Sequence, residues 1–112
     1  MSESLAVHVT PIKYAVNCVP EDVPQHYAWG LTVEYRGKGT WAVMWMGDAL
    51  GADGEWDYEP SPSAREDEWL EAHRFDLDTA LRLAQEQAPK VNVNRLYPAD
   101  VIARHAARKA KQ

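Results

Sequence analysis

The chain has 112 residues, of which 46% are hydrophobic and 26% are charged, and it carries a net charge of −5. This length fits one domain, and the composition is that of a folded protein rather than a disordered chain. The sequence has no apolar run of the roughly 18–20 residues that a membrane helix needs, no secretion-signal pattern, and a single cysteine, which excludes an internal disulfide. We therefore expect one cytoplasmic domain over residues 1–112.

The charge is unevenly distributed along the sequence. Residues 1–47 carry 3 basic and 4 acidic side chains, residues 48–78 carry 2 and 11, and residues 79–112 carry 7 and 2. Such a distribution affects solubility and the encounter with partners rather than the fold.

Residues 5–19 alternate in the manner of an extended strand, with a change of phase in the middle. Val7 and Val9 lie on one phase, and the apolar positions after them lie on the other: Ile12, Tyr14, Val16 and Cys18. Pro11 stands at the change, and because proline cannot donate a hydrogen bond in a sheet, it indicates an edge strand or a bulge. Cys18 has apolar neighbours, so we expect a buried, unreactive thiol.

The middle of the chain predicts two paired strands. Residues 27–35 alternate most clearly, and Gly37-Lys38-Gly39 supplies a turn after them. Residues 40–46 are apolar on both phases, so this strand should be covered on both faces. We expect helices to cover one face and a partner protein, or a second copy of the chain, to cover the other.

A further hairpin is predicted at Asp53-Gly54, and the acids after it should face water while Trp56 and Tyr58 face the core. Residues 90–94 are a candidate for a short fifth strand. Because strands precede helices, we expect an α+β fold: an antiparallel meander sheet of four to five strands, followed by two to three helices packed on one face.

Three helices are predicted in the second half. Ser63 and Glu66 have the spacing of a capping box for a helix to about His73, and Asp76 caps a helix that Pro89 ends. Pro98 fits the first turn of a last helix, with a frayed basic tail from about residue 104. We expect four indoles to pack on helix 77–88: Trp29, Trp41 or Trp45, Trp56 and Trp69.

Three segments carry a resemblance to known sequences: GTWAV, the acidic and helical stretch 51–89, and VNVN at 91–94. Over roughly residues 27–104 the chain resembles a group of small uncharacterised proteins of actinobacteria and their bacteriophages. The resemblance implies a phage or prophage accessory protein acting in a bacterial cytoplasm. It assigns no catalytic residue.

Two sets of side chains suggest chemistry, and each has a simpler interpretation. Glu55, Asp57 and Glu59 form a possible cation site, but acids alternating with aromatic residues are typical of a half-exposed strand, and the spacing does not fit an EF-hand. His73 lies near Glu71 and Asp76 and is a weak candidate for a general base, although a structural hydrogen bond explains it more simply. We expect no metal and no cofactor.

The absence of catalytic motifs favours a binding protein over an enzyme. Our leading interpretation is a small cytoplasmic protein that docks onto another protein or onto itself as a homodimer, through Ala42, Met44, Met46, Glu55, Asp57 and Glu59. One alternative is a small hydrolase-like enzyme using His73 with a neighbouring carboxylate. The other is nucleic-acid binding through the basic C-terminal helix, by Arg95, Arg104, Arg108, Lys109 and Lys111.

Overall fold

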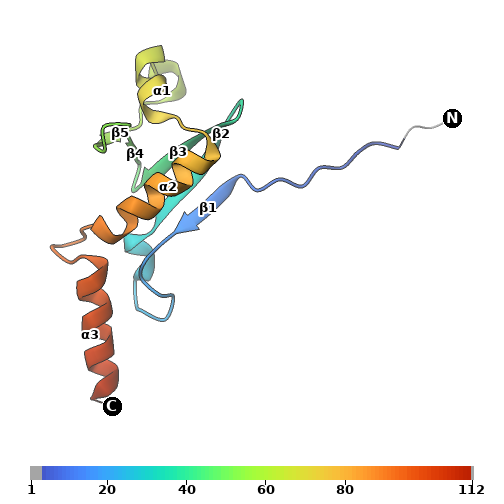
Figure 1. The fold of residues 1–112 in the computed structure, drawn as a ribbon. Helices are drawn as coiled ribbons and strands as arrows, with labels where there is room; N and C mark the ends of the chain where they lie inside the picture. The colour runs from blue at the N-terminus through green and yellow to red at the C-terminus, as the bar shows by residue number, and fades with distance from the viewer. Residues whose placement is uncertain (1–3, 112) are drawn as a thin grey trace.

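A five-stranded antiparallel sheet forms the centre of the structure (Figure 1), a computed structural model that describes residues 4–111. Its strands are adjacent in chain order: β1 (Lys13–Val16), β2 (Leu31–Gly37), β3 (Thr40–Trp45), β4 (Asp48–Leu50) and β5 (Trp56–Tyr58). Three helices follow the sheet: α1 (Asp67–His73), α2 (Leu77–Gln87) and α3 (Pro98–Ala110). The chain also forms three short 3-10 turns: η1 (His26–Trp29) between β1 and β2, η2 (Pro62–Ala64) before α1, and η3 (Ala88–Lys90) after α2. The predicted α+β meander is confirmed.

The β2–β3 hairpin follows the sequence pattern closely. Its turn places Gly37, Lys38 and Gly39 at φ values of 91°, 53° and 74°, a region that glycine enters without steric cost. The strand itself begins later than predicted, because residues before Leu31 form the turn η1. Trp29 in that turn donates its indole N–H to the Leu96 carbonyl at 3.0 Å, which holds the turn against the far end of the chain.

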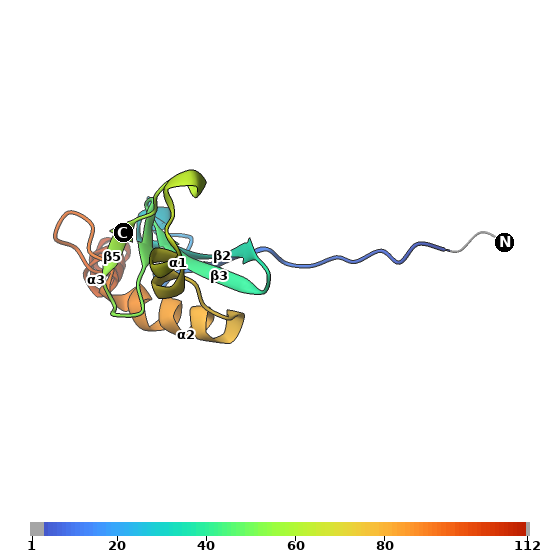
Figure 2. The same cartoon turned by 90° about the horizontal axis from the view of Figure 1, so that it is seen from above.

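The main core lies between the sheet and α2, which runs along β2 and β3 (Figure 2). The sheet contributes large buried side chains, and α2 faces them with small ones: Ala80, Ala84 and, just after its end, Ala88. Small side chains let a helix approach a sheet closely. As predicted, Trp29 and Trp41 are buried in this core, and Trp45 and Trp56 pack at its margin with ring centroids 6.1 Å apart.

The opposite face of β3 has a second, smaller core. Alternation along the strand sends Ala42 and Met44 to this side, where they pack with Ala49 and with Trp69 from α1. The prediction that Trp69 packs on α2 is therefore wrong, because α1 lies on the other side of the sheet. The expectation that a partner covers this face of β3 is also wrong, since the chain itself buries Ala42 and Met44.

The predicted strand over residues 5–19 is much shorter in the structure. Its pairing with β2 begins at Ile12, whose carbonyl accepts a bond from the Tyr35 N–H at 2.9 Å, and β1 ends at Val16. Asn17 then accepts a hydrogen bond from the Val19 N–H at 2.8 Å and turns the chain. Cys18 lies at this turn and is exposed, so its predicted burial is wrong.

Several predicted helix ends and one strand also differ. Ser63 lies in η2 and does not cap α1, which begins at Asp67 after Glu66. Residues 90–94 form no strand but a single bridge between Val93 and Leu96, and the fifth strand is instead β4. The last helix continues to Ala110, beyond the expected fraying point. No helix within residues 4–111 is both long and apolar enough to cross a membrane.

Substitutions in the neighbouring strands β4 and β5 should differ sharply in their effect on the free energy of unfolding. Leu50 in β4 is fully buried in the main core, so Leu50→Ala should lower the free energy of unfolding by about 2–5 kcal/mol. Tyr58 in β5 is 78% exposed, so the expectation that it faces the core is wrong, and Tyr58→Ala should change the free energy of unfolding by only about 0.5 kcal/mol. Chemical denaturation of both variants measures the difference, and equal effects would contradict this placement of the core.

Candidate functional site

His73, the last residue of α1, and Asp57, in β5, form a close pair between the helix and the sheet. Asp57 lies opposite Ala49 in the β4–β5 register, so its side chain shares the face of the smaller core on which α1 lies. The Asp57 Oδ2 is 2.8 Å from His73 Nε2, and His73 Nδ1 is 2.7 Å from the Trp69 carbonyl oxygen. The predicted partners of His73, Glu71 and Asp76, are therefore not the ones that it contacts.

The imidazole of His73 is enclosed by its neighbours. The Trp69 ring stacks on it with centroids 4.2 Å apart and an angle of 9° between the planes. On Gly51 a Cβ would lie 3.3 Å from His73 Nε2, so the chain leaves no free space there. Both ring nitrogens lie within hydrogen-bond distance of oxygen atoms of the chain. This arrangement holds α1 on the sheet and leaves neither nitrogen open to a substrate.

A second polar cluster lies next to the first and joins β2, α1 and the segment after β5. Glu59 contacts three arginines, with oxygen to nitrogen distances of 2.7 Å to Arg74, 3.1 Å to Arg36 and 3.4 Å to Arg65. The Glu59 and Arg74 side chains are only 9% and 7% exposed. Burial by itself would raise the pKa of Glu59, but the hydrogen bond from Arg74 and the charges of Arg36 and Arg74 outweigh it and lower this pKa.

The predicted docking residues do not form one surface. Ala42 and Met44 are buried, whereas Met46 lies in the β3–β4 turn and is 75% exposed. Of the three acids, Glu55 and Asp57 are exposed, although Asp57 also contacts His73, and Glu59 is largely buried among the arginines. The acidic row is thus not a simple solvated strand face. Within residues 4–111, no group of three or more His, Cys, Asp or Glu side chains is placed to hold a metal ion.

The surface offers little support for a catalytic cleft at His73. His73 lines none of four of the best-formed depressions in the described part of the chain. The one nearest to it opens beside Arg36, Arg65 and Arg74, whose guanidinium groups already contact Glu59. The cluster therefore has a structural role: it holds the end of α1 against the sheet.

A different feature stands out as a candidate interaction surface, the N-terminal arm, which we define as residues 4–12. It extends away from the body of the molecule in both views (Figures 1 and 2). Leu5, Val7 and Val9 are 90%, 86% and 95% exposed. Single exposed apolar residues are common, but three at alternating positions resemble one face of a strand that lacks its sheet. Sequence reasoning placed these residues inside the sheet and so missed the surface.

The arm continues directly into β1, which is an edge strand with one free side. Ile12 bonds to Tyr35, and Tyr14 and Val16 follow at alternate positions, so their backbone groups point toward β2. The backbone groups of Lys13 and Ala15 consequently point outward. An unpaired strand edge of this kind is a template for another strand.

Comparisons of the chain with protein-family models, with curated proteins and with solved structures give no match. The resemblance to proteins of actinobacteria and their bacteriophages therefore stays a prediction.

The contacts of Glu59 predict a measurable contribution to stability. Glu59→Gln removes the charge that faces the buried Arg74, and we expect it to lower the free energy of unfolding by about 1.5–3 kcal/mol. The matched control is Glu55→Gln, because Glu55 is exposed, and this change should have an effect within about 0.5 kcal/mol.

The pH dependence of this difference has a defined sign. In the folded protein the pKa of Glu59 is lowered from its ordinary value of 4.5. The contribution of Glu59 to the free energy of unfolding is therefore complete above about pH 4.5 and is lost as the pH falls toward the folded pKa. The stability difference between the wild type and Glu59→Gln should therefore shrink below about pH 4.5 in urea titrations. A difference that grows on acidification would contradict the cluster.

Proposed function

We propose that the protein is a non-catalytic binding protein that engages a protein partner through strand addition, using the N-terminal arm and the adjoining free edge of β1. The observation that carries this proposal is the exposure of Leu5, Val7 and Val9 at alternating positions of the arm. Strand addition is a recurring mode of recognition in which main-chain bonds give affinity and alternate side chains give specificity.

The energetics favour a partner that offers a sheet edge to the arm over a partner that offers only an apolar surface. Burying one valine or leucine contributes about 1.5–3 kcal/mol, whereas fixing the backbone of a residue costs about 1–2 kcal/mol. Three apolar side chains do not offset this cost over residues 4–12, so main-chain hydrogen bonds must contribute as well. A sheet edge supplies such bonds at every second residue.

The other two functions have weaker support. His73 is enclosed and bonded at both nitrogens, which does not suit a general base. In α3, Lys109 and His105 contact Asp22 at 2.7 Å and 3.2 Å, so part of the basic tail faces an acid of the same chain rather than a phosphate. In the setting that the resemblance implies, a partner other than the chain itself would be a host protein.

Photo-crosslinking tests this function directly. Val7 is replaced by the photoreactive residue p-benzoylphenylalanine in an actinobacterial host, and Tyr58, exposed in β5 far along the chain from the arm, is replaced in the same way as a control. We expect a defined covalent adduct with a protein from the Val7 position and none from Tyr58. If the arm position gives no adduct above the control, the proposed function is wrong.

A further inference from the structure

We propose that the arm's partner is a second copy of this chain: two protomers exchange their arms, and each arm pairs with the free edge of β1 in the other protomer. The two five-stranded sheets would then join across a two-fold axis. This inference rests on the proposed function, because it names the partner of the same arm.

The change of apolar phase at Pro11 carries the argument. Tyr14 and Val16 face the α2 side of the sheet, and Ile12 shares their alternation. In an uninterrupted strand, Leu5, Val7 and Val9 would face the opposite side. One extra residue at Pro11, a β-bulge, reverses the alternation and brings all three to the α2 side. Because proline has no N–H, a bulge at this position loses no donor from the ladder.

The α2 side of β1 offers an apolar margin to receive these side chains. Tyr14, Val16 and Leu81 pack against the main core but stay partly exposed. Gln87 lines a depression with Trp45 and Trp56 on the β5 side of α2, so helical spacing places Leu81 on the flank toward β1. A strand added outside β1 would direct its apolar face toward this margin.

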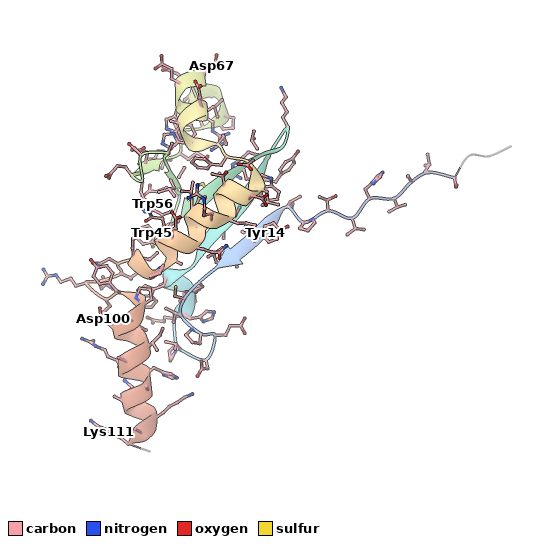
Figure 3. The ribbon with its side chains drawn as sticks, in the orientation of Figure 1. Tyr14, Trp45, Trp56, Asp67, Asp100 and Lys111 are labelled. Atoms are coloured by element: carbon pink, nitrogen blue, oxygen red, sulfur yellow. The ribbon has the colours of Figure 1, made fainter. Side chains whose placement is uncertain are left out.

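Figure 3 shows the side chains of the arm standing free of the rest of the molecule, whereas Tyr14 lies against the body. Within residues 4–111, no hydrogen bond involves the backbone before Ile12. At about 3.3 Å per residue, residues 4–12 extend about 30 Å, which exceeds the length of the four-residue strand β1. The arm is therefore long enough to pair along the whole free edge of β1 in a second protomer.

The distribution of acidic residues favours the pairing of the β1 edge with a second copy of the chain. Residues 4–16 contain Lys13 as their one lysine or arginine and no acid, whereas residues 48–78 carry 11 acids and 2 bases. The acidic segment includes β4 and β5 at the opposite side of the sheet from β1. Joining two protomers through β1 therefore keeps the two acidic segments apart and brings no acids of the arms together. The other edge strand, β5, has only three residues and lies within the acidic segment.

Sedimentation equilibrium of the purified full chain tests the exchange. We expect a reversible dimer whose Kd rises on the order of 100-fold in Val7→Lys, because the lysine would have to enter the apolar margin under α2. The matched control is His8→Lys, in which the same charge is added at the next position, on the solvent side of the added strand. This control should leave Kd nearly unchanged.

Both residues are exposed in the single chain, so neither substitution should alter the thermal unfolding of the monomer, and a folding defect is separated from a binding defect. A wild-type chain that stays monomeric up to near-millimolar concentration would overturn the exchange, and the proposed function would still stand if the arm crosslinks to another protein. A dimer that tolerates Val7→Lys, or that is weakened equally by His8→Lys, would also overturn the exchange.

Discussion

The burial of β3 on both faces is the constraint on which the rest of the structure depends. Trp41 and Val43 face α2, while Ala42 and Met44 face α1, and all four are buried. A strand of this kind needs a layer on each side. The helices α1 and α2 supply these two layers, and because they have only seven and eleven residues they cover only the middle of the sheet. The helices cover β2, β3 and β4, and the coverage ends at β1.

The polar clusters follow from this constraint. The helix α1 has seven residues and contributes Trp69 as its main apolar contact with the sheet, so apolar packing alone holds it weakly. The bond between His73 and Asp57 and the contacts between Arg74 and Glu59 fasten its C-terminal end. Side chains that resemble catalytic groups in the sequence thus stabilise the second layer of the domain.

The sequence was most informative where the signal is local. The turn at Gly37-Lys38-Gly39, the hairpin at Asp53-Gly54 and the alanines of α2 depend on neighbouring residues, and all were predicted correctly. The side of the sheet on which Trp69 lies depends on the path of the chain between β5 and α1, for which the sequence has no signal. The pairing of His73 with Asp57 depends on that same path and could not be predicted.

The arm is a third case: the sequence contained the alternation of a strand, but we assigned that strand to the sheet of the same chain. The change of phase at Pro11 indicated a bulge, and we placed that bulge inside the sheet of one chain. In the structure, β2 ends at Gly37 and leaves no strand for residues 4–11 to pair with. A pattern of alternating apolar residues specifies that a strand has a buried face, but it does not specify which molecule buries it.

Amide hydrogen exchange of the arm, measured residue by residue by NMR at a concentration where the chain is assembled, is the most direct test. With a bulge at Pro11, the N–H groups of Ala6, His8 and Thr10 point toward the β1 edge of the other protomer, and those of Val7 and Val9 point away. We therefore expect slow exchange at the first three positions and fast exchange at the other two. Fast exchange at all five positions, at the rate of an unstructured chain, would show that the arm is not paired and would contradict the proposed mode of binding.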